Sequence, residues 1–89
     1  MPATMVFIDK KAQKQLEELP KHIQIKVSDV IDVLEKEGFS KKLDINKLKG
    51  LPNHFRIRVG TYRILFAFAY GDTITIYAIR HRKTAYSQF

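Results

Sequence analysis

Residues 55–80 read FRIRVGTYRILFAFAYGDTITIYAIR, a stretch in which short apolar runs are separated by two glycine-containing turns. Its first part alternates apolar and basic residues with a period of two, which is the pattern of a strand with one buried face. Gly60-Thr61 and Gly71-Asp72 interrupt the apolar runs, and such pairs are typical of tight hairpin turns. The stretch therefore predicts three antiparallel strands in a meander, from Phe55 to Val59, from Tyr62 to Tyr70 and from Thr73 to Arg80.

Two-residue turns fix which residues face each other across these strands. Counting back from the first turn places Arg58 opposite Arg63. Counting back from the second turn sets Tyr70 against Thr73 and Arg63 against Arg80. Directly paired residues share a face, and a slip of one residue moves a side chain to the other face. One end of one face is therefore predicted to carry four arginines, Arg56, Arg58, Arg63 and Arg80.

Like charges that lie directly opposite each other destabilise a sheet. The three predicted strands contain no acidic residue that would neutralise the arginines. A phosphate, or the carboxylates of a partner, is expected to supply the missing negative charge.

The other residues of the meander divide between the two faces. The face without arginines is expected to form the core layer, with Phe55, Ile57, Val59, Tyr62, Ile64, Phe66, Phe68, Tyr77 and Ile79. The arginine face is expected to continue as an apolar patch of Leu65, Ala67, Ala69, Ile74, Ile76 and Ala78. Either a long connection of the chain or a partner segment would cover this patch.

The residues before the meander have a helical period. Asp9 is expected to cap a helix that ends near Leu19, and apolar residues at three-four spacing predict a second helix from Lys21 to Glu37. Pro20 fits the first turn of the second helix, and Gly38 fits its C-cap.

The order of these elements predicts a single α+β domain over residues 1–89. A short N-terminal strand, from Val6 to Ile8, and a two-helix antiparallel hairpin pack on a mainly antiparallel sheet that ends in the three-stranded meander. Residues 39–51 follow no regular period and are expected to be irregular.

The basic charge of the chain lies in its second half. The net charge is +7, but residues 1–40 hold six Lys and seven acidic residues, a sum of −1, whereas residues 41–89 hold ten basic and two acidic residues, a sum of +8. Such a field suits a nucleic acid or an acidic protein partner. The alternative is a basic face that serves only solubility. This alternative does not explain why the arginines stand within apolar, strand-like runs.

The residue types that are absent also narrow the function. No cysteine is present, which excludes a disulfide framework, a thiolate zinc site and a thiol nucleophile. Three dispersed histidines predict no metal site, and no cofactor is expected. The sequence contains neither a signal-peptide pattern nor an apolar run long enough to span a membrane, so a cytoplasmic protein is expected.

Two runs of sequence carry a resemblance to a known family. NKLKGLPNHFRIRVGTYRILFAF, residues 46–68, followed by HRKTAY, residues 81–86, closely resembles the RelE/ParE toxin superfamily, and specifically its RelE-type mRNA endonuclease branch. The resemblance covers the whole chain. It implies a toxin of a type II toxin-antitoxin system that cleaves mRNA in the ribosomal A site, by metal-independent attack of a ribose 2′-hydroxyl on the adjacent phosphate.

The resemblance also implies roles for individual residues. It assigns charge stabilisation to three arginines and the role of general base to the C-terminal tyrosine, so that the catalytic set is Arg58, Arg63, Arg82 and Tyr86. Contacts to RNA or phosphate are expected from Lys47, Lys49, Arg56, Arg80 and His81. Since arginine does not readily lose a proton, proton transfer would depend on the tyrosine. His81 is expected to be mainly structural.

The implied partners are mRNA on the ribosome and a cognate antitoxin. The antitoxin is expected to be acidic and to wrap the toxin, with a heterotetramer as one assembly. One other function stays open at this point, a ParE-like inhibitor of DNA gyrase without nuclease activity. A plain RNA-binding module is disfavoured, because the basic strands lack the exposed aromatic platform on which such modules stack bases.

Overall fold

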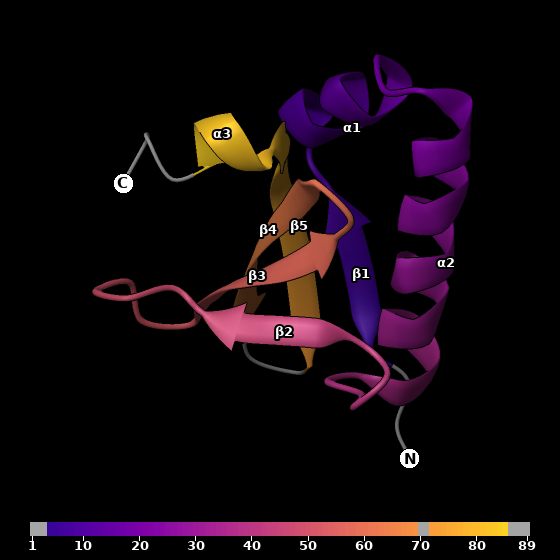
Figure 1. The fold of residues 1–89 in the computed structure, drawn as a ribbon. Coiled ribbons are helices and arrows are strands. Elements are labelled where there is room, and N and C mark those ends of the chain that lie inside the picture. The colour runs from indigo at the N-terminus through magenta and orange to yellow at the C-terminus, as the bar shows by residue number, and fades with distance from the viewer. Residues whose placement is uncertain (1–3, 70–71, 86–89) are drawn as a thin grey trace.

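The computed structural model describes residues 4–69 and 72–85, and Figure 1 shows how they are arranged. Five strands form one mixed sheet in the order β1-β5-β4-β3-β2, in which β1 runs parallel to β5 and the other neighbours are antiparallel. The predicted α+β class with a short N-terminal strand is confirmed. The elements are β1 (Met5–Ile8), α1 (Lys10–Glu17), α2 (Lys21–Glu37), β2 (Asp44–Lys47), β3 (His54–Val59), β4 (Tyr62–Ala69), β5 (Thr73–His81) and α3 (Arg82–Ala85).

Local chemistry explains where α1 begins and where α2 ends. The Asp9 carboxylate accepts a hydrogen bond from the Ala12 N–H at 2.8 Å, which satisfies an unpaired donor at the start of α1. Helix α2 ends at Gly38, whose φ of 68° suits glycine and whose N–H donates to the Leu34 carbonyl at 2.9 Å. The predicted N-cap of α1 and C-cap of α2 are confirmed, whereas Pro20 is the N-cap of α2 and does not lie in its first turn.

The two helices contact different parts of the sheet. Figure 1 shows that α2 runs along one side of the sheet, whereas α1 lies across its end, close to β5. The main core lies between these helices and the sheet. Its fully buried members include Ala12, Val27, Leu34, Ile57, Ile64, Phe66, Ile74 and Ile76. None of the helices in the described ranges is long and apolar enough to cross a bilayer.

The pairing of the meander agrees with the sequence prediction at the arginine end. Arg58 lies opposite Arg63, and Arg63 lies opposite Arg80. At the other end of the β4–β5 pair the predicted register is wrong, because Thr73 pairs with Ala69 and not with Tyr70. A β-bulge lies between the two ends and shifts the register by one residue. The prediction is therefore correct on the arginine side of the bulge and wrong on the other side.

The bulge changes which residues of β5 face the core. Phe66 pairs with Ile76 and Leu65 pairs with Ala78, so Tyr77 is the extra residue. Ile74 and Ile76 are therefore fully buried in the main core, and the prediction that they lie on the arginine face is wrong. Tyr77 was expected in the core layer but packs on the arginine face, against the small cluster of Leu48, Leu65 and Ala78.

Strand β2 is a correction to the prediction that residues 39–51 are irregular. Its four residues pair with β3, with Ile45 opposite Ile57 and Asp44 opposite Arg58. After β2 the chain folds back, and Leu48 packs with Leu51 over Leu65. Part of the predicted apolar patch is thus covered by a connection of the chain itself.

Candidate functional site

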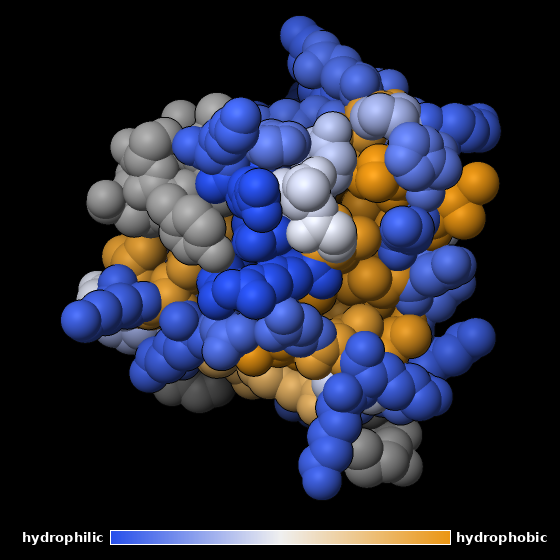
Figure 2. Space-filling model, in the orientation of Figure 1, coloured by the Kyte–Doolittle hydropathy of each residue, from blue (hydrophilic) through white to orange (hydrophobic). Residues whose placement is uncertain are grey.

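Four arginines meet on the face of the sheet that does not contact the helices. Their strands pair side by side, so the side chains form one group next to the β3–β4 turn. Figure 2 shows strongly hydrophilic side chains gathered over this part of the sheet, beside apolar surface. We call this group the arginine cluster, and its members are Arg56, Arg58, Arg63 and Arg80.

Arg63 is the most deeply buried member of the arginine cluster. It is only 6% exposed, and its Nη1 donates hydrogen bonds to the carbonyls of Gly60 at 3.0 Å and Tyr62 at 2.9 Å. These bonds hold the β3–β4 turn, and the buried guanidinium keeps its positive charge because arginine does not deprotonate in proteins. Arg63 therefore contributes both charge and local order to the cluster.

Arg58 is the exposed member of the arginine cluster and has an acidic neighbour. Its Nε lies 3.7 Å from Oδ2 of Asp44 in β2, and both side chains are about half exposed. The sequence offered no acid here because β2 was not predicted. An ion pair of this exposure and distance contributes little and is easily exchanged for another anion.

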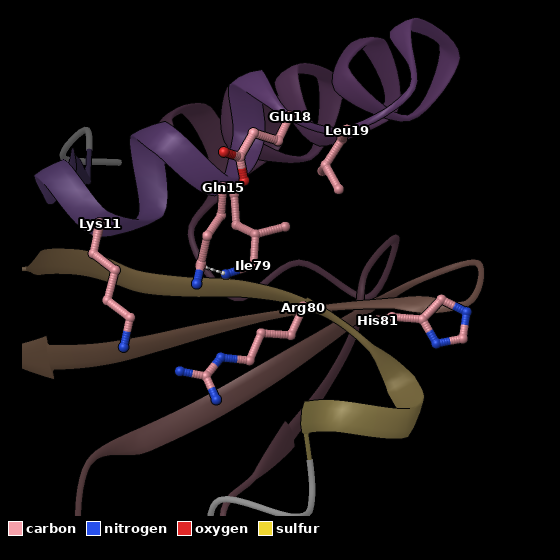
Figure 3. A pocket seen from close by; sticks show the side chains of 7 residues that line it. All are labelled: Lys11, Gln15, Glu18, Leu19, Ile79, Arg80 and His81. Atoms are coloured by element: carbon pink, nitrogen blue, oxygen red, sulfur yellow. Dashed lines mark hydrogen bonds between the residues drawn. The ribbon is translucent and has the colours of Figure 1, made fainter.

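Arg80 faces an open pocket of about 480 Å³ between α1 and the end of β5. Its Nη1 is buried and has no hydrogen-bond partner within the described part of the chain. Figure 3 shows that Arg80 and Lys11 point toward the same side of this pocket. The pocket is lined by Lys11, Gln15, Glu18, Leu19, Ile79, Arg80 and His81.

The residues that follow Arg80 differ in their surroundings. His81 is partly buried, its ring meets the Tyr62 ring edge to face at 5.4 Å, and its Nδ1 accepts a bond from the Lys83 N–H at 3.3 Å. Arg82 begins α3 with an exposed side chain, while its main-chain N–H donates to the Thr61 carbonyl at 2.7 Å. The backbone of Arg82 is thus tied to the turn that Arg63 holds.

Lys47 and Lys49 are predicted site residues that the fold does not bring into the cluster. Lys47 is exposed and pairs with Phe55, at the end of β3 far from Arg58. Lys49 is exposed in the loop after β2. Tyr86, the predicted base, lies outside the described residues.

A histidine and tyrosine pair beside the arginine cluster was not found from the sequence. Nδ1 of His54 lies 3.0 Å from the hydroxyl of Tyr77, and their rings meet edge to face at 5.4 Å. Burial raises the pKa of Tyr77, and the nearby Arg80 charge acts in the opposite direction. No sequence pattern shows this pair, because it depends on the bulge in β5.

We expect Tyr77 to ionise at a higher pH than an ordinary tyrosine, whose pKa is about 10. Since the folded chain favours the neutral phenol, the free energy of unfolding should fall as the pH rises past that value, where the unfolded phenol loses its proton first. An ultraviolet absorbance titration of the four tyrosines measures this. Tyr77→Phe should remove an ionisation that lies above the usual tyrosine range. A difference between the wild type and Tyr77→Phe that lies only at about pH 10 would contradict the assignment.

Comparisons with known proteins agree with this architecture. A family model described as ParE toxin of type II toxin-antitoxin system, parDE, matches residues 6–86. Toxin RelE3 of Methanocaldococcus jannaschii is 38% identical over 86 residues, which are 94% of this chain and 97% of that protein.

Two solved structures have the same fold over nearly their whole length. A RelB-RelE antitoxin-toxin complex from Methanococcus jannaschii has a TM-score of 0.81 at 37% identity, covering 93% of this chain and 98% of the other. An archaeal RelE-RelB complex from Pyrococcus horikoshii has a TM-score of 0.79 at 31% identity, covering 93% and 99%. The chain therefore belongs to the RelE/ParE superfamily of toxins from type II toxin-antitoxin systems.

Proposed function

We propose that this toxin is an endoribonuclease that cleaves mRNA in the ribosomal A site. The observation that carries the proposal is the arginine cluster, in which two pairs of arginines lie directly opposite each other across neighbouring strands. Such pairing destabilises the empty protein and is relieved when a phosphate lies between the charges. The most similar relatives named above are RelE toxins, which favours RNA as the source of that phosphate.

The proposed reaction uses the RNA itself as the nucleophile. The ribose 2′-oxygen bonds to the adjacent phosphorus while the bond from phosphorus to the 5′-oxygen breaks. A base takes the proton of the 2′-hydroxyl, and an acid gives a proton to the leaving 5′-oxygen. The products are a 2′,3′-cyclic phosphate and a 5′-hydroxyl. The step adds negative charge around phosphorus, which fixed guanidinium groups stabilise.

The arginines divide this work according to their exposure. Arg58 and Arg82 are exposed and can contact phosphate oxygens directly, and Arg80 reaches the same region from β5. Buried Arg63 adds charge and fixes the turn. Because none of these groups donates or accepts a proton easily, we assign the base to Tyr86.

The remaining basic residues are proposed to bind RNA along its phosphate backbone, where each contact adds affinity that depends on salt. Lys47 and Lys49 would do so outside the arginine cluster, and Arg56 within it. His81 is proposed to contact RNA weakly, since its ring packs against Tyr62.

A cognate antitoxin is proposed as the protein partner. The solved relatives are toxin-antitoxin complexes, and the +8 half of this chain suits an acidic segment that wraps it. We propose that the complex forms in the cytoplasm and can assemble as a heterotetramer.

The second candidate function is inhibition of DNA gyrase, because the matching family model is described as a ParE toxin. Induced expression followed by mapping of mRNA ends in a translating extract, with a gyrase supercoiling assay in parallel, separates the two. We expect new mRNA ends within codons and normal supercoiling. Intact mRNA together with inhibited supercoiling would replace the nuclease proposal with the gyrase one.

The carboxylate of Asp44 gives a direct test of phosphate binding at the cluster. Asp44→Asn removes the anion beside Arg58, so we expect a single-stranded RNA with 2′-O-methyl groups to bind about twofold to fivefold more tightly at low salt. The gain should shrink at high salt, where the charges are screened. The matched control is Asp32→Asn, which makes the same charge change at an exposed position of α2. Equal effects of the two substitutions would show that RNA does not bind near Arg58.

A further inference from the structure

One edge of β5 lacks a neighbouring strand beyond the end of β1. β1 pairs with β5 only as far as Ile76, whereas β5 continues to His81. A main-chain bond from the Asp9 N–H to the Ile76 carbonyl, at 3.0 Å, closes this pairing. The part of β5 that follows carries Arg80 and needs other partners for its outward N–H groups.

Gln15 of α1 provides such a partner. Its Oε1 accepts a hydrogen bond from the Ile79 N–H at 2.8 Å, drawn as a dashed line in Figure 3. Ile79 is only 2% exposed, so water is poorly placed to replace this acceptor. Fully buried Ala12 lets the helix lie close to the strand, and Gln15 is on the same side of α1 three residues later.

The same end of β5 is also held from its other side. Ile79 lies opposite Ile64 in β4, and the Arg82 N–H donates to the Thr61 carbonyl at 2.7 Å. Arg80 is thus between two backbone positions that are each fixed by a bond from another element. Precise spacing of charged groups is what a site that stabilises a charged transition state requires.

We propose that Gln15 is a positioning residue for phosphate cleavage. Its bond to the Ile79 N–H holds the end of β5 against α1, so that Arg80 and Arg82 keep the spacing that a phosphate between them needs. This inference rests on the proposed function, and the backbone bond on which it depends can be measured without RNA.

Three variants isolate the acceptor. Gln15→Met keeps the length and helix propensity of the side chain but removes the acceptor, and Gln15→Glu keeps an acceptor. Gln13→Met is the matched control, because the Gln13 side chain is exposed on the same helix and bonds only Glu17 among the described residues. The readouts are amide hydrogen exchange at Ile79, the NMR signals of the Arg80 and Arg82 side chains, single-turnover cleavage and RNA affinity.

We expect Gln15→Met to speed exchange at Ile79 and to slow cleavage, each by about tenfold, the equivalent of one lost hydrogen bond. RNA affinity should change little, because no phosphate contact is removed. Gln15→Glu keeps the acceptor and should restore exchange at Ile79 to near the wild-type rate, and Gln13→Met should change neither rate. Wild-type cleavage by Gln15→Met, or equally fast exchange at Ile79 in Gln15→Met and Gln15→Glu, would overturn the proposal.

If the proposed nuclease function is wrong, the wild type itself cleaves no RNA. The NMR signals of the Arg80 and Arg82 side chains then decide whether Gln15 positions these arginines. Shifted or broadened signals of Arg80 and Arg82 in Gln15→Met, but not in Gln13→Met, would support positioning by Gln15. Unchanged signals would overturn it.

Discussion

Arg82→Ala is expected to slow RNA cleavage by about 10² to 10³, the loss found when a fixed group that stabilises transition-state charge is removed. The side chain of Arg82 is exposed, and the bond that ties this position to Thr61 comes from the main chain. The variant should therefore fold like the wild type. Single-turnover cleavage of mRNA on programmed ribosomes measures the effect, and circular dichroism checks the fold.

The neighbouring Lys83 gives the matched control for this prediction. Its side chain is also exposed on α3 and carries the same charge. Lys83→Ala should change the rate by no more than about fivefold, as expected for the loss of an exposed charge. Similar losses in the two variants would mean that general positive charge, and not the place of Arg82, supports cleavage.

Phe66→Ala is expected to lower the free energy of unfolding by about 3 to 5 kcal/mol, the cost of emptying a large buried site. Phe66 is fully buried, stacks on Phe55 with ring centroids 5.4 Å apart, and meets Phe39 edge to face at 5.6 Å. A chain of 89 residues has a total stability of only about 4 to 13 kcal/mol. The variant should be partly unfolded at physiological temperature, which urea denaturation measures.

Phe39 belongs to the same group of rings but is 45% exposed. Phe39→Ala should cost clearly less than Phe66→Ala, about 1 to 2 kcal/mol, because its ring leaves a smaller buried space. An equal cost for both substitutions would contradict the assignment of Phe66 to the centre of the core.

The turn residues made the arginine cluster predictable. Gly60-Thr61 allows one simple pairing of β3 with β4, and that pairing fixes Arg58 opposite Arg63. The second pairing, Arg63 opposite Arg80, was correct although the register near Thr73 was not. The predicted register was one residue off next to the turn. The bulge lies between the turn and Arg80 and shifts the pairing by one residue, so the prediction was correct at the arginine end.

The bulge itself was not visible in the sequence. Residues 74–79 read ITIYAI and are apolar at nearly every position, so no alternation marks where the face changes. Pairing with β1 buries Ile74 and Ile76 together with Val6 and Ile8, and this tertiary contact decides the register there. Strand periodicity cannot show a contact with a segment so distant along the chain.

Two features of the site could not be predicted from the sequence, because one depends on a very short strand and the other on a single side chain. Strand β2 has only four residues, too few for a period, and with it came the ion pair of Asp44 and Arg58. Gln15 is one polar residue on a short helix, and its bond to Ile79 joins positions that are 64 residues apart. The family resemblance predicted which residue types form the site. The contacts that hold those residues in place could be seen only in the folded structure.

We propose that this chain cleaves RNA at the arginine cluster by attack of the RNA's own 2′-hydroxyl. The most direct test uses ribosomes programmed with an A-site codon in which one ribose at the cleaved bond lacks its 2′-hydroxyl. We predict that the wild-type chain cuts the all-ribose message, leaves a 2′,3′-cyclic phosphate and a 5′-hydroxyl, and leaves the 2′-deoxy message intact. Cleavage of both messages at equal rates, or of neither, would contradict the account.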